Sequence, residues 1–531
     1  MAPPARMPLR PPATPTRWIA ALLVVGLAAA HIRMLAFLCD DAFIAFRYAR
    51  SWAEGFGPVF NVGERVEGYT DFLWVAVLAS VLKLGGTLEF WAPRLGAAAA
   101  LATLVVLMVA LERRTPWSGI LAGTLLGASA SWAAWATGGL ETALFTLLVT
   151  VAFLQSLEVL AGGGTRAAAA SGACLALAAM TRPDGLLFAG ATFVVLAAQA
   201  ARGRLPWRSV WVWCALLAAL FGPYFAWRWA YYGQLLPHTF AVKVGGAAML
   251  GPGIAYLGAA AARLHPELLL IPGAALLALR LPAGVSRSEL AMWSAWVLPF
   301  TAYVAWVGGD FMDLFRFLAP LVPLLAWIAA RGSASLAETL ERRVRAGRIV
   351  AAAVALLVLA GWTAINLRAS SESTEAWNRQ GLDSIGLLRQ YAADWTLIGL
   401  FFATVAQPSD TLATSAAGII PYYSRLHTID ELGLVARDLS QYRRLDSPRS
   451  GHALSITGQA LLEARPQYLV SHPVVAASPG ALPVGISVEP GWGARFAEHY
   501  QGLTVSLSET PPRFFSFVAR RDVAAKLRQG P

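Results

Sequence analysis

A series of long apolar segments is the feature of this sequence that most restricts its fold. Twelve such segments occur before residue 367, and the first, residues 18–38, would form a helix about 30 Å long, which is one bilayer core. Only 14% of the residues are charged, whereas a soluble domain carries about 25%. The pattern excludes a soluble enzyme and a disordered chain, and it predicts an all-α polytopic membrane domain with about 11 transmembrane helices.

Basic residues between these segments predict how the chain is oriented in the membrane. Residues 202–208 and 331–348 form basic loops, and cytoplasmic loops are enriched in Lys and Arg. This enrichment explains the net charge of +11 without a nucleic-acid partner. With those loops inside, residues 39–71 lie outside, and the chain needs an odd number of crossings between residues 70 and 111. Two apolar segments occur there, so either one of them does not span fully or residues 113–114 lie outside.

The composition changes after residue 367. Residues 368–531 are polar and rich in turns, with short alternating segments such as TVSLS and FFSFVARR that are typical of strands. We therefore expect a cytoplasmic tail (1–17), a transmembrane domain (18–367) and a soluble extracytoplasmic α/β domain (368–531). The chain has three cysteines and no C-x-x-C motif, so no zinc or redox site is indicated.

Two adjacent aspartates follow the first apolar segment. Asp40 and Asp41 begin the outer loop 39–71, and residues 41–54 have the pattern of an amphipathic helix at the membrane interface, with Arg47 on its exposed side. The pair can serve as an N-cap and as a partner of the helix dipole. A partly desolvated carboxylate at an interface can instead act as a general base towards a sugar hydroxyl. Both interpretations are open at this point.

A set of motifs resembles the GT-C-type polytopic glycosyltransferases. The outer loop from DDAFIAFRYAR to YTDFLW is followed by TGGLETALF (137–145), MTRPDG (180–185), YYGQLLPHTFAVKV (231–244), GGDFMDLFRFLAPLVPLL (308–325), AGIIPYYSRLHTIDELGL (417–434) and GHALS (451–455). Within that class the set is similar to the actinobacterial arabinofuranosyltransferases, which use decaprenyl-phosphoryl-arabinose and add terminal residues to cell-wall arabinan. The resemblance covers roughly residues 38–470, so the first span and residues 480–531 lie mostly outside it.

The resemblance implies a reaction and its partners. A polyprenyl-phosphate sugar is the donor on the outer face of the bacterial inner membrane, and a cell-envelope glycan or glycolipid is the acceptor. Arabinofuranose is the leading sugar. Asp40 or Asp41 takes the proton of the acceptor hydroxyl, the lipid phosphate leaves and the anomeric configuration inverts. No cofactor is expected, although the two aspartates could hold a divalent metal.

The resemblance also assigns roles to polar residues at the outer ends of the apolar segments, where charge is costly and tends to serve function. The candidates for binding the donor phosphate are Arg47, Arg182, His238, Lys243 and Arg316. The candidates for binding sugar or acceptor are Glu67, Glu141, Asp184, Asp310, Tyr422, Tyr423, Asp430 and His452. Structural roles are the alternative for these residues: an Arg–Asp pair between helices, a helix cap, a snorkelling lysine, or tyrosines packed in a core. For the whole chain, a lipid-linked sugar transporter or flippase and a non-enzymatic envelope or motility factor are the alternative functions.

Overall fold

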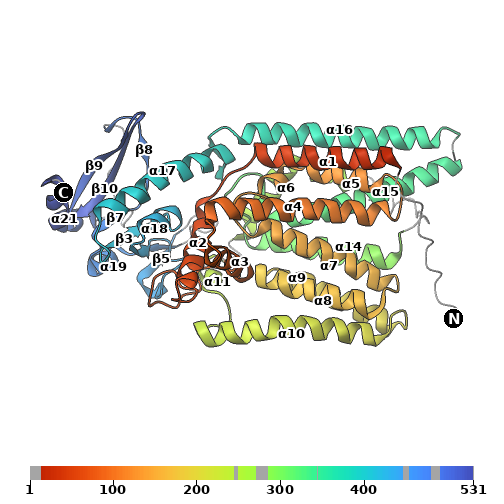
Figure 1. Cartoon of the computed structure of the whole chain (residues 1–531), viewed down its shortest axis with the longest axis horizontal. Coiled ribbons are helices and arrows are strands. Elements are labelled where there is room, and N and C mark those ends of the chain that lie inside the picture. The colour runs from red at the N-terminus through yellow and green to blue at the C-terminus, as the bar shows by residue number, and fades with distance from the viewer. Residues whose placement is uncertain are drawn as a thin grey trace.

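The computed structural model describes residues 14–243, 249–270, 285–343, 345–445, 454–479 and 491–529. Long helices lie roughly side by side in a bundle, and a part that contains strands covers one end of it (Figure 1). The last described helix, α21 (Arg521–Gln529), belongs to this strand-containing part, which begins at β1. A mostly helical chain with a C-terminal part that mixes helices and strands is therefore confirmed.

Apolar helices build the bundle. Within the described residues, six helical stretches are long and apolar enough to cross a membrane: α1 (Pro15–Met34), α4 (Leu88–Glu112), α7 (Thr142–Leu160), α10 (Trp207–Tyr232), the stretch Arg316–Arg342 and α16 (Gly347–Ser373). The stretch Arg316–Arg342 consists of η3 (Arg316–Leu321) and most of α15 (Val322–Arg343). Further described helices of the bundle are α5 (Ser118–Ala128), α6 (Ala130–Ala134), α8 (Gly164–Thr181), α9 (Gly185–Ala201), α11 (His238–Lys243), α12 (Leu250–Leu264), η2 (Pro266–Leu269) and α14 (Arg287–Trp306). The number of crossings, about 11, stays a prediction.

The orientation predicted from the basic loops requires an odd number of membrane crossings between residues 70 and 111. The short helix α3 (Phe72–Lys83) lies in this range. It has 12 residues and is about 18 Å long, which is too short for a bilayer core of about 30 Å. The following helix, α4, has 25 residues and is long enough. The structure therefore favours the alternative in which only one of the two apolar segments between residues 70 and 111 spans fully.

A mixed sheet organises the C-terminal part. Its strands follow the order β4-β3-β7-β10-β8, and β9 also pairs with β10. The bounds are β3 (Thr411–Thr414), β4 (His427–Asp430), β7 (Tyr468–Val470), β8 (Val475–Ala476), β9 (Tyr500–Glu509) and β10 (Pro512–Arg520). β3 runs parallel to β4 and β7, whereas β10 is antiparallel to β7, β8 and β9. Partly buried and exposed residues alternate along most of β9, as expected for a strand with one face towards a core.

Helices flank this sheet, and two small strand pairs lie outside it. The helices are α17 (Ile385–Val405), α18 (Ile419–Ser424), η4 (Leu439–Gln441), α19 (Gly458–Ala464), α20 (Gly493–His499) and α21 (Arg521–Gln529). The pairs are β1 (Asn378–Arg379) with β2 (Leu382–Asp383), and β5 (Tyr442–Arg444) with β6 (Leu454–Ile456). Phe402 of α17 packs on Phe515 and Phe517 of β10, which joins the long helix to the sheet.

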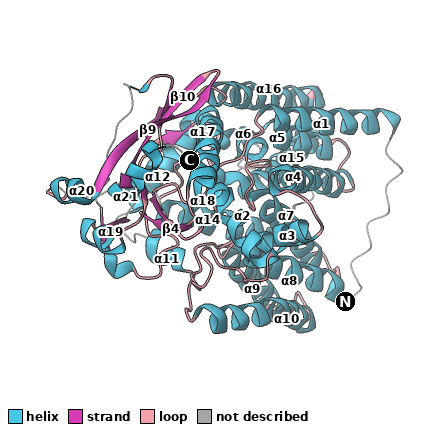
Figure 2. Ribbon diagram, turned by 60° about the vertical axis from the view of Figure 1, so that its left-hand side comes forward, coloured by secondary structure: helices cyan, strands magenta, loops and turns pink. Residues whose placement is uncertain are grey.

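Helix α2 (Asp40–Ala53) lies where the bundle meets the C-terminal part, beside α3 and α18 (Figures 1 and 2). Most of it is buried, and Arg47 is only 7% exposed, so the expectation that Arg47 lies on an exposed side is wrong. The reason is that a second protein surface, not solvent, covers the polar side of the helix. All five N–H groups of Arg47 donate to acceptors in that surface or in the outer loop: Phe60 O (2.8 Å), Pro421 O (2.8 Å), Thr428 Oγ1 (3.3 Å), Asn61 Oδ1 (3.0 Å) and Leu426 O (2.7 Å).

Replacing Arg47 by lysine should destabilise the protein. An ammonium group cannot reach acceptors that are spread around a planar guanidinium, and each buried acceptor left unpaired costs about 1–3 kcal/mol. We expect Arg47→Lys to lower the midpoint of thermal unfolding by several degrees in detergent. Arg50→Lys is the matched control, because half-buried Arg50 donates one hydrogen bond, to Tyr422 O. Equal midpoints for the two variants would contradict the structural role of Arg47.

Candidate functional site

Two cavities meet at Asp41, between the bundle and the C-terminal part. The first, which we name the arginine cavity, has a volume of about 1020 Å³ and is lined by Asp41, Thr70, Asp71, Glu141, Arg182, Asp184, Thr239, Tyr303, Arg316 and Phe317, among others. The second, which we name the acidic cavity, has a volume of about 1210 Å³ and is lined by Asp40, Asp41, Asp383, Tyr391, Trp395, Asp430 and His472, among others. Asp41 and its neighbour Ile44 thus contribute to both.

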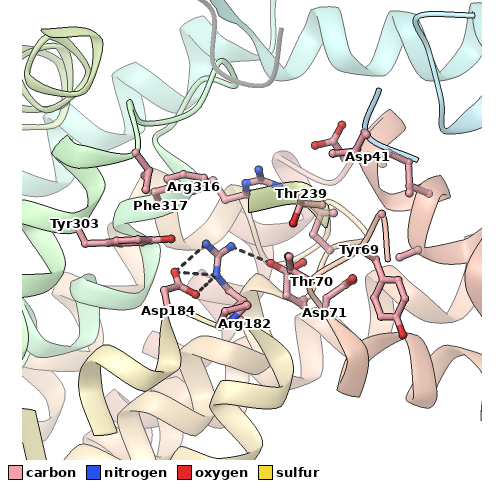
Figure 3. Close-up of a pocket in the computed structure, with 18 residues that line it drawn as sticks. Asp41, Tyr69, Thr70, Asp71, Arg182, Asp184, Thr239, Tyr303, Arg316 and Phe317 are labelled. Atoms are coloured by element: carbon pink, nitrogen blue, oxygen red, sulfur yellow. Dashed lines mark hydrogen bonds and ion pairs between the residues drawn. The ribbon is translucent and has the colours of Figure 1, made fainter. Parts of the chain in front are cut away.

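Arg182 stands in the break between α8 and α9 and is held by two carboxylates (Figure 3). Its Nε donates to Asp184 Oδ1 at 3.0 Å, and its Nη1 donates to Glu141 Oε1 at 2.9 Å. Asp184 and Glu141 occupy the N-cap positions of α9 and α7 but make no side-chain cap bond. The two acids therefore orient the guanidinium rather than cap their helices.

Arg316 reaches the same cavity from the first position of η3. Its Nε lies 2.7 Å from Asp310 Oδ2, and Asp310 in turn accepts a hydrogen bond from Phe311 N. The guanidinium groups of Arg316 and Arg182 both lie over the ring of Phe317, at 5.4 and 5.2 Å from its centroid. Two arginines that are 134 positions apart in the sequence thus face one small region, where they can hold an anion.

The loop that carries Asp310 and leads into Arg316 has a constrained backbone. Gly309 has φ +71°, and a Cβ atom there would collide with the ring of Tyr256. The loop is also bonded to β2, since Asp313 N donates to Asp383 O and Asp383 N donates to Phe311 O, each at 2.9 Å. Asp313 is fully buried and pairs with Arg263 at 3.2 Å. The position of Arg316 therefore depends on both the bundle and the C-terminal part.

The two adjacent aspartates have different surroundings. The N-cap of α2 is Cys39, so Asp40 is not the cap that the sequence allowed for. The Asp40 carboxylate instead accepts hydrogen bonds from Gly418 N (3.1 Å) and Ile419 N (2.6 Å), which begin α18. Gly418 permits this approach, because a Cβ atom there would collide with the backbone of Asp40. Asp41 points into the arginine cavity, near Arg316 (Figure 3).

Burial raises the pKa of Asp40 from 3.8 to about 7, and the carboxylates of Asp41 and Asp430 act in the same direction. The hydrogen bonds from Ile419 N and Gly418 N oppose this shift. Asp40 is therefore the member of the pair whose protonation is coupled to the contact between α2 and α18.

Some of the other candidates lie away from both cavities. Glu67 forms an ion pair with Arg228 of α10 at 2.6 Å, and both side chains are buried. His238 is buried with its Nε2 at 3.3 Å from Gly433 O, while its neighbour Thr239 lines the arginine cavity. Arg47 is fully engaged in the contacts described above. We therefore assign Glu67, His238 and Arg47 positions in the scaffold around the site.

The candidates of the C-terminal part are divided. Asp430 lines the acidic cavity and accepts hydrogen bonds from Leu432 N and Val435 N. Tyr422 packs under the Arg50 guanidinium, which lies 3.5 Å from its ring centroid, and the Tyr423 hydroxyl donates to Glu89. Neither tyrosine lines a cavity described above. His452 and the side chain of Lys243, at the end of α11, lie outside the part of the chain that the structure describes.

Several residues of the two cavities were not among the sequence candidates. Tyr303 and Phe317 belong to apolar segments, where an aromatic residue gives no signal of its own. Tyr391 and Trp395 are four residues apart on α17, so a helical reading puts them on one face. Among the residues that the structure describes, no group of three or more His, Cys, Asp or Glu side chains is arranged to hold a metal ion.

The pKa of Asp40 predicts a pH-dependent stability. The folded state keeps the proton of Asp40 up to pH about 7, whereas an unfolded chain loses it near pH 4, so this stabilising contribution disappears as the pH rises through that interval. Asp40→Asn keeps an acceptor oxygen and cannot ionise. The thermal unfolding midpoint of both proteins is measured from pH about 5 to about 8. The midpoint of the variant minus that of wild type should increase as the pH rises over this range. A difference that is the same across this range would contradict the assigned pKa.

Comparisons with known proteins identify relatives of this chain. Residues 384–522 match a family described as "Domain of unknown function (DUF8728)". The chain is 31% identical over 328 residues to the terminal beta-(1->2)-arabinofuranosyltransferase of Corynebacterium glutamicum, covering 54% of this chain and 47% of that protein. It is 31% identical over 225 residues to the Mycobacterium tuberculosis protein of the same name, covering 39% of this chain and 35% of that one. The chain thus spans less than half the length of these relatives.

Solved structures share the fold over nearly the whole chain. ArnT from Cupriavidus metallidurans in the apo state aligns with a TM-score of 0.59 and 14% identity, covering 96% of this chain and 99% of ArnT. The oligosaccharyltransferase of Archaeoglobus fulgidus in the apo form aligns with a TM-score of 0.52 and 12% identity, over 77% of this chain and 64% of that one. The predicted resemblance is therefore confirmed: the chain is a multi-pass membrane protein related in sequence to the terminal arabinofuranosyltransferases, and it has the fold of the GT-C glycosyltransferases.

Proposed function

We propose that the protein is a glycosyltransferase that moves a sugar from a polyprenyl-phosphate donor to a cell-envelope glycan or glycolipid, with inversion. The observation that carries this proposal is the position of Asp41, which lines both a cavity with two arginines and a second, acidic cavity. The names of the sequence relatives make arabinofuranose the leading sugar.

The arginine cavity is the proposed site of the donor phosphate. Arg316 pairs with Asp310 through Nε, and within the described residues its two terminal nitrogens form no hydrogen bond or ion pair. Those nitrogens can bind two phosphate oxygens as a fork. Arg182 adds a second positive charge across Phe317. The structure of ArnT solved with undecaprenyl phosphate supports a lipid phosphate as the carrier of the sugar.

Asp41 is the proposed general base. The acceptor hydroxyl oxygen attacks the anomeric carbon while the bond from that carbon to the phosphate oxygen breaks. The hydroxyl proton passes to the Asp41 carboxylate, and the lipid phosphate leaves with the bonding electrons, stabilised by Arg316 and Arg182. Asp40 is a positioning residue, because its carboxylate is bonded to the start of α18 and holds the first turn of α2 in place.

The same proposal includes the location of the protein. The chain lies in the bacterial inner membrane and crosses it about 11 times, and residues 18–367 form the transmembrane domain. The site and residues 368–531 are on the extracytoplasmic side. The basic loops 202–208 and 331–348 support this orientation, since cytoplasmic loops are enriched in Lys and Arg.

Substitution of Asp41 tests the proposal. Purified protein in nanodiscs, supplied with decaprenyl-phosphoryl-arabinose and an octyl oligoarabinofuranoside, should transfer the sugar. Asp41→Asn should lower kcat by about 10²–10⁴-fold, because the acceptor proton loses its base, with little change in the unfolding midpoint. Asp40→Asn should keep measurable transfer, and Asp438→Asn, at an exposed position, should equal wild type.

Two outcomes would contradict the proposal. Transfer by Asp41→Asn at the wild-type rate would remove the assigned base. Wild-type protein that transfers no sugar from this donor or from decaprenyl-phosphoryl-mannose, but moves the lipid across a vesicle membrane, would favour a transporter.

A further inference from the structure

The wall of the acidic cavity that α17 contributes is an aromatic surface. Tyr391 and Trp395 both line the cavity, and their rings are stacked with centroids 4.8 Å apart and an interplanar angle of 9°. Neither ring is fully buried. The indole Nε1 of Trp395 donates to Pro473 O at 3.0 Å, which ties the ring to the loop that follows β7. The pair is therefore a fixed, partly exposed aromatic surface in the wall of a cavity that also contains carboxylates.

The charge of the acidic cavity contrasts with that of the arginine cavity. Four carboxylates line it, those of Asp40, Asp41, Asp383 and Asp430, together with the exposed imidazole of His472. Among the described residues of its lining there is no Lys or Arg. A phosphate or carboxylate group placed here would meet like charges with no cation to offset them. Hydroxyl groups, in contrast, can donate hydrogen bonds to carboxylate oxygens.

We infer that the acidic cavity binds an uncharged saccharide, with one sugar ring lying on the Tyr391–Trp395 surface and its hydroxyls donating to carboxylates that line the same cavity. An aromatic face suits the C–H side of a sugar ring, whereas the carboxylates suit its hydroxyl edge. The cavity thus takes a neutral glycan end and excludes an acceptor whose reacting end carries a phosphate.

The role of this saccharide as the acceptor rests on the proposed function. Asp41 belongs to both cavities, so a sugar held against α17 would present a hydroxyl to the same carboxylate that faces the donor side. The binding of the saccharide itself depends only on the cavity, and the two statements can be tested separately.

The test uses the full-length protein in nanodiscs and three probes. The neutral probes are octyl glycosides of an oligoarabinofuranose and of an oligomannose, and the third probe is the former with a phosphate monoester on its terminal sugar. Binding is measured by saturation-transfer NMR and microscale thermophoresis. Wild-type protein should bind at least one neutral glycoside, and should bind the phosphorylated probe at least about tenfold more weakly than that glycoside. Trp395→Ala should weaken binding of the neutral glycoside roughly tenfold.

Trp395→Phe is the matched control. It removes the hydrogen bond to Pro473 O but keeps an aromatic ring, so binding should stay close to wild type if the ring is the binding surface. Tyr391→Ala should behave like Trp395→Ala, and the KM for the lipid donor should be unchanged in all three variants.

The outcomes separate the two proposals. Failure of the wild type to bind either neutral glycoside, equal binding by Trp395→Ala, or tighter binding of the phosphorylated probe would overturn the saccharide site. Binding that depends on Trp395 without any sugar transfer would leave the saccharide site standing and remove the proposed function. Sugar transfer with an acceptor KM that is unaffected by Trp395→Ala would leave the proposed function standing and overturn the saccharide site.

Discussion

The hydrogen bonds between α2 and the segment around α18 are the contact on which the site depends. Asp40 and Arg47 are seven residues apart, so they lie on one face of the helix, and both bond to this segment of the C-terminal part. Successive residues of an α-helix are rotated by about 100°, so fixing Asp40 against α18 turns Asp41 away from it and towards the cavities. One of two adjacent aspartates is thereby structural, which leaves the other to face ligands.

Most charges around the arginine cavity are paired, and the pairing explains why the cavity can be both stable and reactive. Glu141 and Asp184 hold Arg182, and Asp310 holds Arg316 through one nitrogen. A buried guanidinium without a partner is costly, whereas one held by carboxylates keeps a fixed orientation. Donors that are already oriented need no rearrangement when a leaving phosphate gains charge, which is the usual source of electrostatic stabilisation in enzymes. In the proposed reaction, the acids would therefore act on the leaving phosphate through the arginines.

The sequence predicted the helical bundle and the C-terminal strands, and it placed Arg182 and Arg316 among the phosphate candidates at the outer ends of the apolar segments. It could not separate Asp40 from Asp41, since the partner of Asp40 is a backbone 378 and 379 positions away. It misplaced Arg47 for a related reason. An amphipathic pattern shows which side of a helix is polar, but a polar side can meet either water or another polar protein surface. The spacing of Tyr391 and Trp395 predicts that they share one face of a helix, but only the structure shows that this face lines a cavity.

The shared position of Asp41 also bears on stereochemistry. Inversion requires the attacking oxygen and the leaving phosphate to lie on opposite sides of the anomeric carbon. A base is needed on the side of attack, and positive charge is needed on the side of departure. The cations of the two cavities are separated in that sense: Arg182 and Arg316 line one cavity, no Lys or Arg is among the described residues that line the other, and Asp41 lines both. A retaining mechanism would need the carboxylate itself to bond to the sugar carbon, and nothing would then be gained from placing it beside a second, acidic cavity.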